Sequence, residues 1–206
     1  GRDQYDFYTE SLNDRAEQLM TLERELRHGL RREEFFLLFQ PQVDLNTGDI
    51  TAMEALIRWQ HPERGEILPD QFIPVAEDTG MIMPLGNWAL QQACMQIKLL
   101  HQLLGRGVRV AVNISARQFR DPGLENVIEF ALRTSGLEPR FLEIDIHEGM
   151  LSDEPDMARD QLARIRRTGV TITLDDFGTG FSSLRQLRSL PVDMLKIGQT
   201  FVKGVP

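Results

Sequence analysis

Two adjacent aspartates, Asp175 and Asp176, follow a short run rich in β-branched residues and stand directly before a turn that contains two glycines. Successive side chains of a strand point to opposite faces, so two neighbouring acids can act on one ligand only where the strand ends. The carboxyl ends of the strands are where α/β barrels place their active sites. The same pair fits an ordinary solvated turn equally well, because aspartate is a common turn residue.

Further oxygen-bearing side chains stand near the carboxyl ends of apolar runs that predict strands, and one lysine stands at the end of another such run. These residues are Glu54, Asn113, Asp145, Glu148 and Lys196. Each of them alone has an ordinary structural explanation, such as an ion pair, a cap that binds the backbone or a surface lysine. If these side chains gather at the rim of one sheet, burying their carboxylates without a partner would be very costly. This cost favours a bound cation.

The oxygen atoms of these side chains determine which metal ions they could bind and which reaction those ions could support. Carboxylate and amide oxygens without a thiolate favour Mg²⁺ or Mn²⁺ over zinc. Two carboxylates on adjacent residues could let one of them bridge two metal ions, an arrangement suited to in-line attack on a phosphodiester. A nearby lysine, here Lys196, could then neutralise the developing phosphoryl charge or hold the attacking water.

Strands and helices alternate along most of the chain, and this order determines where the polar side chains must lie. Strands are predicted over residues 34–40, 50–59, 109–113, 141–146, 169–175 and 192–197. Helices are predicted over residues 12–31, 70–77, 85–104, 124–134, 156–167 and 182–187. Such alternation is typical of parallel βαβ units in an α/β domain. The first strand is expected to be buried, to end at Pro41 and to pair with the second strand as a hairpin.

The length and charge of the chain indicate its number of domains and exclude some classes of function. Its 206 residues suffice for one sizeable domain from about residue 32 onward, while residues 12–31 form a lead-in helix or a connector. With 23 basic and 31 acidic residues, the net charge of −8 argues against a protein that binds nucleic-acid polymers. No signal peptide or long apolar span is present, so we expect a cytoplasmic domain without direct membrane insertion, although a parent protein could be membrane-anchored. Cys94, the only cysteine, is expected to be a structural core thiol.

Motifs spread along the chain resemble those of the EAL domain, the bacterial phosphodiesterase module that acts on cyclic di-GMP. The signature Glu54-Ala55-Leu56 lies within a predicted strand. The further matches, in the family's order, are residues 40–41, 72–80, 112–115, 175–180 and 190–197. The similarity covers about residues 32–203, and residues 5–34 resemble the connector between a GGDEF (diguanylate cyclase-like) domain and an EAL domain. By this resemblance, residues 1–31 are a linker helix from an upstream GGDEF domain and residues 32–206 are an EAL domain.

The resemblance implies a fold, a reaction and a set of site residues. The fold is a TIM-like (β/α)8 barrel with an antiparallel first strand. The reaction is hydrolysis of cyclic di-GMP to pGpG by a homodimer that uses two Mg²⁺ or Mn²⁺ ions, with GGDEF or sensor domains in the same polypeptide. The implied metal ligands are Glu54, Asn113, Asp145, Asp175 and Asp176, and the implied catalytic residues are Glu54, Asp176 and Lys196. The implied nucleotide contacts are Gln40, Leu56 and Arg58, and Glu148 would brace the loop after Asp176.

Three positions depart from the family pattern. Asp145 and His147 stand where the family has glutamate and threonine, and Gly198 replaces an aspartate that supports the metal-site loop. An aspartate is one methylene shorter, which withdraws its carboxylate by about 1.5 Å, and a Mg²⁺ shell tolerates little slack. His147 could be a fortuitous metal ligand, but it is expected to face a loop or to be satisfied in the core. A catalytically weak or inactive cyclic di-GMP receptor is therefore the alternative function, and a dimerisation module without a ligand is the third.

The chain is also shorter than the barrel that the resemblance implies. A (β/α)8 barrel typically has about 250 residues, so about two strands with their helices are expected to be missing from the 206 residues. We expect that the chain omits residues that the natural protein has, and the alternatives are strands supplied by a partner or a degenerate fold. The segment alone is expected to be inactive.

Overall fold

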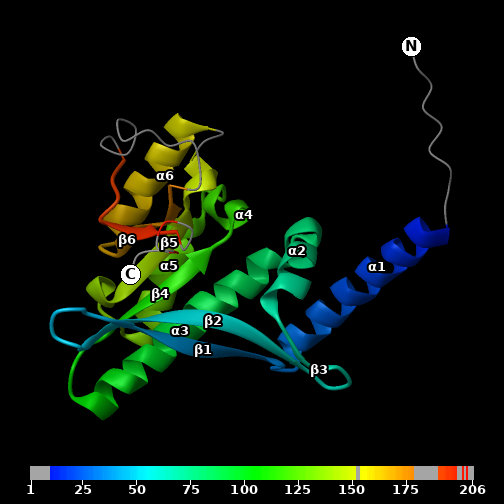
Figure 1. The fold of residues 1–206 in the computed structure, drawn as a ribbon, viewed down its shortest axis with the longest axis horizontal. Coiled ribbons are helices and arrows are strands. Elements are labelled where there is room, and N and C mark those ends of the chain that lie inside the picture. The colour runs from blue at the N-terminus through cyan, green and yellow to red at the C-terminus, as the bar shows by residue number, and fades with distance from the viewer. Residues whose placement is uncertain (1–9, 152–153, 179–189, 199–200, 202, 204–206) are drawn as a thin grey trace. The chain divides into compact units, whose positions relative to one another are not determined.

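The computed structural model describes residues 10–151, 154–178, 190–198, 201 and 203, with side chains from residue 20 onward (Figure 1). These residues belong to two compact units, one of Gly1–Phe36 with Arg58–Ile82 and one of Leu37–Ile57 with Met83–Pro206. The helix predicted over residues 182–187 lies outside the described residues. No helix in the described part of the chain is long and apolar enough to cross a membrane.

An aromatic cluster forms the core of the first unit. The unit comprises α1 (Glu10–Arg31), β3 (Gly65–Ile67) and α2 (Pro69–Thr79), with the start of β1 (Phe35–Val43) and the end of β2 (Ile50–His61). Phe35, Trp59 and Phe72 are buried, and their ring centroids lie 5.1, 5.7 and 5.8 Å apart. Trp59 Nε1 donates a hydrogen bond to Glu34 Oε2 at 3.0 Å, which satisfies the one polar atom of the indole.

A sheet in the order β1-β2-β4-β5-β6-β7 organises the second unit. Its further strands are β4 (Arg109–Ile114), β5 (Leu142–His147), β6 (Thr171–Phe177) and β7 (Met194–Ile197). Its helices are α3 (Ile82–Leu104), α4 (Ala116–Phe119), α5 (Leu124–Ser135) and α6 (Pro155–Arg167), with 3₁₀ turns at Pro139–Phe141 and Glu148–Leu151. Neighbouring strands from β2 to β7 pair in parallel, whereas β1 forms a hairpin with β2 through a turn in which Asp44 N donates to Asp49 O at 2.9 Å. The predicted α/β class and the antiparallel first strand are confirmed, and the described strands form an open sheet.

Side chains along each parallel strand point alternately to an apolar face and to a polar face of the sheet. On β5, Ile144 belongs to a core that also contains apolar side chains of α5 and α6, the helices that Figure 1 shows beside these strands. The next residue, Asp145, points to the other face because the side-chain period of a strand is two. Asn113 pairs in register with Asp145, and Asp145 pairs with Thr173, so polar side chains from three strands share one row.

Strand β1 corrects the prediction of a buried strand that ends at Pro41. The strand continues to Val43, and only Phe35 and Leu37 of its nine residues are buried. Among the described strands, β1 lies at one end of the sheet order. Proline lacks the N–H that a central strand needs, and an edge strand tolerates this loss because one side of its backbone has no strand partner. The short elements β3 and α4 were not predicted from the sequence.

Cys94 confirms the expectation of a structural core thiol. It lies within α3 with none of its surface exposed, and burial raises the pKa of its thiol to about 12. We therefore expect no reaction of the native protein with a thiol reagent such as DTNB near pH 8, because the thiolate is the reactive species. Absorbance of the released thiol should appear only when urea unfolds the chain, and stoichiometric labelling of the native protein within minutes would contradict this burial.

Candidate active site

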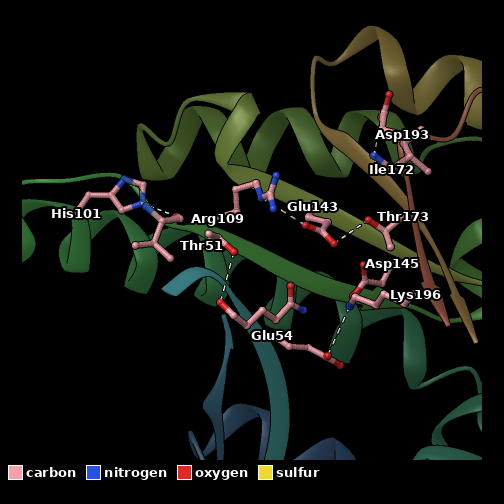
Figure 2. A network of polar contacts seen from close by, with 12 residues as sticks. Thr51, Glu54, His101, Arg109, Glu143, Asp145, Ile172, Thr173, Asp193 and Lys196 are labelled. Carbon is pink, nitrogen blue, oxygen red and sulfur yellow. Dashed lines mark hydrogen bonds and ion pairs between the residues drawn. The ribbon is translucent and has the colours of Figure 1, made fainter. Parts of the chain in front are cut away.

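Four predicted site residues from four different parallel strands converge on the polar face of the sheet: Glu54 of β2, Asn113 of β4, Asp145 of β5 and Lys196 of β7. Figure 2 labels three of them, Glu54, Asp145 and Lys196. Asn113 Nδ2 donates a hydrogen bond to Glu54 Oε1 at 2.9 Å. The ammonium of Lys196 forms a hydrogen-bonded ion pair with Asp145 Oδ2 and lies 3.6 Å from Glu54 Oε2. One cation thus links two carboxylates that are 91 positions apart in the sequence (145 − 54).

The place of Glu54 differs from the prediction that it stands near the carboxyl end of its strand. Strand β2 has twelve residues, of which only Ala52–Ala55 pair with β4, while Trp59–His61 pair with β3. Glu54 is therefore the fifth residue of a long strand, close to the end of the part that pairs with β4. The pairing partner, and not the end of the strand, places this carboxylate beside Asn113.

Burial sets the electrostatics of Asp145. Its side chain has no exposed surface, and burial raises the pKa of Asp145 to about 7, with Lys196 acting against this rise and Glu143 and Glu54 adding to it. Burial lowers the pKa of Lys196, but Asp145, Glu54 and Asp175 together raise it above its ordinary value. Asp145 Oδ1 is buried and has no hydrogen-bond partner among the described residues. A buried carboxylate oxygen of this kind is costly unless something pairs with it.

A β-bulge brings Asp175 and Asp176 next to Lys196. Leu174 pairs with Leu195 and Phe177 pairs with Ile197, so the two aspartates together oppose a single residue of β7. Asp176 has φ 54°, in the left-handed region, and its N–H donates to Asp175 Oδ1 at 2.9 Å. The pair was predicted to stand where the strand ends, whereas β6 continues to Phe177 and the bulge changes the direction of the side chains.

A second polar cluster lies on the same face of the sheet and was not predicted. Thr173 Oγ1 donates to Glu143 Oε1 at 2.7 Å, and Arg109 Nε lies 3.7 Å from Glu143 Oε2 (Figure 2). Glu143 is fully buried, and its charge adds to the rise in the pKa of Asp145. Its position two residues before Asp145 on β5 is the signal that could have revealed it, because such residues share a face.

The buried carboxylate of Glu148 contacts the residue that follows β6. Glu148 comes directly after β5, and its Oε2 accepts a hydrogen bond from Gly178 N–H at 2.9 Å. The contact joins the end of one strand to the start of the loop after Asp176, which is the loop that Glu148 was expected to brace.

The donor set fits a hard divalent cation. Carboxylates of Glu54, Asp145, Asp175 and Asp176 and the amide oxygen of Asn113 are ligands that Mg²⁺ and Mn²⁺ prefer. Asp145 Oδ1, which has no partner among the residues that the structure describes, supplies a further lone pair inside the site. As the described side chains lie, no group of three or more histidines, cysteines, aspartates and glutamates is arranged to hold an ion, and the Lys196 ammonium contacts two of the carboxylates.

Residues 23–206 match the family model of the EAL domain. The chain belongs to the EAL domain family. Cyclic di-GMP phosphodiesterase NbdA of Pseudomonas aeruginosa is 40% identical over 206 residues, which are 100% of this chain and 26% of NbdA. The bifunctional diguanylate cyclase/cyclic di-GMP phosphodiesterase MucR of the same organism is 39% identical over 202 residues, 98% of this chain and 30% of MucR. The chain therefore spans about a quarter to a third of the length of these relatives.

Solved EAL structures share the fold of this chain. The MucR phosphodiesterase in complex with cyclic di-GMP gives a TM-score of 0.84 at 39% identity, over 89% of this chain and 74% of that one. The EAL enzyme Bd1971, bound to cAMP and cyclic di-GMP, gives a TM-score of 0.81 at 33% identity, over 91% of this chain and 52% of that one. This likeness supports the predicted fold class.

The three nucleotide contacts predicted for this EAL domain lie in different parts of the chain. Gln40 is exposed on β1 and Leu56 is half-buried on β2, both in the second unit. Arg58 belongs to the first unit, where its Nε lies 3.4 Å from Glu66 Oε1 of β3. Their role in binding a nucleotide stays a prediction.

Replacing Glu148 by alanine should weaken the protection of the Gly178 backbone amide. The change removes the acceptor of the Gly178 N–H, and a typical hydrogen bond contributes about 0.5–1.5 kcal/mol to stability. We expect faster hydrogen exchange of the Gly178 amide, measured by NMR. Glu148→Gln keeps an acceptor oxygen and should preserve most of the protection. Equal protection in the alanine variant would contradict a bracing contact.

Proposed function

We propose that this EAL domain is a metal-dependent phosphodiesterase that hydrolyses cyclic di-GMP to pGpG in bacterial second-messenger signalling. The observation that carries the proposal is the convergence of Glu54, Asn113, Asp145 and Lys196 from four parallel strands, beside the two aspartates of the β6 bulge. The names of NbdA and MucR, which are cyclic di-GMP phosphodiesterases, support the same reaction.

In this proposal the acidic residues hold the cations and Lys196 acts on the phosphate. Glu54, Asn113, Asp145 and Asp175 would hold one Mg²⁺ or Mn²⁺ ion, and Asp175 with Asp176 a second. When bound, such ions stabilise negative charge on the phosphoryl oxygens and lower the pKa of a coordinated water. Lys196 carries its positive charge at neutral pH, because its carboxylate neighbours raise its pKa, so it can neutralise phosphoryl charge or hold the attacking water.

A catalytically weak or inactive cyclic di-GMP receptor is the second candidate. The observation in its favour is Asp145, whose short side chain is fully buried and already paired with Lys196. A carboxylate held in this way reaches less far toward a metal than the glutamate of the family pattern. The receptor would keep the nucleotide pocket and lose the turnover.

The proposal extends to the protein around this domain. Since MucR is named as a bifunctional diguanylate cyclase and phosphodiesterase, we include an upstream GGDEF domain in the same polypeptide. Homodimerisation follows from the family resemblance alone. The dinucleotide substrate is an intracellular messenger, so the proposed place of action is the cytoplasm.

Turnover and binding measured on the full-length protein decide between the two candidates. Cyclic di-GMP is incubated with Mg²⁺ or Mn²⁺, and pGpG is quantified by chromatography while affinity is measured by calorimetry. Release of pGpG that stops on addition of EDTA supports the phosphodiesterase. Tight binding without release supports the receptor, and absence of both refutes the two candidates together.

A further inference from the structure

His147 makes a close polar contact with the second aspartate of the bulge. It is the last residue of β5 and pairs in register with Asp175, and its Nε2 lies 3.3 Å from Asp176 Oδ2. On the other side of the ring, Nδ1 accepts a hydrogen bond from the Gly149 N–H at 3.2 Å. His147 is therefore neither a core histidine nor a residue that faces only its loop, because the ring lies between Gly149 and Asp176.

The Gly149 contact determines which ring nitrogen carries the proton. A nitrogen that accepts a hydrogen bond has no hydrogen, so the neutral ring carries its hydrogen on Nε2. This N–H is then available to the carboxylate of Asp176. Both side chains are about half exposed, at 50% and 49%, so the aspartate is not held in place by burial.

The backbone of Asp176 does not follow the regular geometry of the strand. At φ 54° it lies in the left-handed region, which is sparsely populated by residues other than glycine, and the bulge directs its side chain away from the regular alternation. A donor on the neighbouring strand restricts the rotamers of such a side chain. Hydrogen-bond partners that orient ligating groups contribute about 10–100-fold to metal affinity.

We propose that His147 is a positioning residue for Asp176: its Nε2–H, oriented by Gly149, holds the Asp176 carboxylate at the bulge beside Lys196. This role rests on the proposed function only where Asp176 engages a cation. The contact itself is a property of β5 and β6. It gives a reason for histidine at a position where the family pattern has threonine, since the short threonine side chain does not span both contacts.

The first test is the protonation of the ring in the protein without added metal. NMR of the ring nitrogens should show hydrogen on Nε2, and Asp176→Asn should shift the Nε2–H resonance while leaving Nδ1 nearly unchanged. Asparagine is tolerated at positive φ, so this variant keeps the backbone. Hydrogen on Nδ1, or an Nε2–H resonance that does not respond to Asp176→Asn, would overturn the proposal.

Two conservative variants of His147 separate the two contacts of the ring. The glutamine nitrogen in His147→Gln takes the place of Nε2 and retains a donor for Asp176. The asparagine oxygen in His147→Asn takes the place of Nδ1 and retains only the acceptor for Gly149. Mn²⁺ affinity, measured by electron paramagnetic resonance, should fall about 10-fold in His147→Asn and stay near the wild-type value in His147→Gln.

The outcomes distinguish failure of this inference from failure of the proposed function. The reverse order of affinities would mean that His147 holds only the Gly149 turn, and equal losses in both variants would mean that the ring itself is required; either result overturns the positioning role. If the unaltered protein binds no Mn²⁺, the proposed metal chemistry fails, and the ring-nitrogen spectrum then decides the role of His147 by itself.

Discussion

Replacing Glu54 by glutamine is expected to reduce the metal-dependent release of pGpG by about 100-fold or more. Glutamine has the same shape and keeps an oxygen that can accept from Asn113 Nδ2, so the local packing should survive. It lacks the negative charge by which a carboxylate binds a divalent cation more tightly than a neutral amide does. Metal ions contribute several kcal/mol to such reactions, and each 1.36 kcal/mol of lost stabilisation is a factor of about ten in rate.

The measurement is the initial rate of pGpG release in Mn²⁺, with Glu138→Gln as the matched control. Glu138 is an exposed glutamate of the same unit that pairs with Arg140 at 2.9 Å on the surface. Its replacement removes the same charge at a place that touches no candidate site residue, and the rate should not change. A Glu54→Gln variant that retains a tenth of the activity would place the metal chemistry elsewhere.

Replacing Lys196 by methionine should destabilise the domain by about 2–3 kcal/mol near pH 8, as well as lower any turnover. The change leaves the Asp145 carboxylate, whose side chain is fully buried, without its cation. Removing one partner of a fully buried pair costs about 3–5 kcal/mol, and the 21% exposure of the lysine side chain reduces this value. Urea unfolding in EDTA, followed by tryptophan fluorescence, measures the loss.

The loss should be smaller at lower pH. Burial raises the pKa of Asp145 to about 7 in the folded protein, well above its value in an unfolded chain. Between these two pKa values the folded state therefore binds more protons than the unfolded chain. The free-energy cost of a buried, ionised Asp145 carboxylate without its lysine grows as the pH rises through the folded pKa. At about pH 5.5 a protonated Asp145 needs no cation, so the methionine variant should approach the stability of the unaltered protein.

The double variant Asp145→Asn/Lys196→Met isolates the pair. With the charge of Asp145 removed, the loss of the Lys196 ammonium should have little effect, and most of the stability should return. A double variant as unstable as Lys196→Met alone would show that the lysine stabilises through the packing of its apolar stem.

Local sequence signals were sufficient to predict most strands and helices of the second unit. The predicted strand 109–113 and helix 124–134 correspond within one residue to β4 and α5. Helix α5 ends at Ser135, and Gly136 directly after it adopts the left-handed conformation that commonly terminates a helix. Hydrophobic periodicity and such stop signals are contained in a few neighbouring residues, so they can be read without the fold.

Residue chemistry alone also indicated which side chains gather on the sheet. Glu54, Asn113, Asp145 and Lys196 were chosen as oxygen ligands and a cation within or just after apolar runs, and the structure brings all four together. Their catalytic roles stay predictions. Glu143 was not predicted although it lies on the same face as Asp145, because Asp145 already supplied the one polar side chain expected near the end of that strand.

Residue types and short-range periodicity were enough to predict most of the element order and the side chains that gather on the polar face, because both signals lie within a few neighbouring residues. They could not predict that β1 passes through Pro41, that Glu54 lies at the fifth residue of β2, or that a bulge turns Asp176 toward His147. The length, register and bulges of a strand depend on its pairing partner. Most of those partners lie tens of residues away along the chain, where no local pattern can reach them.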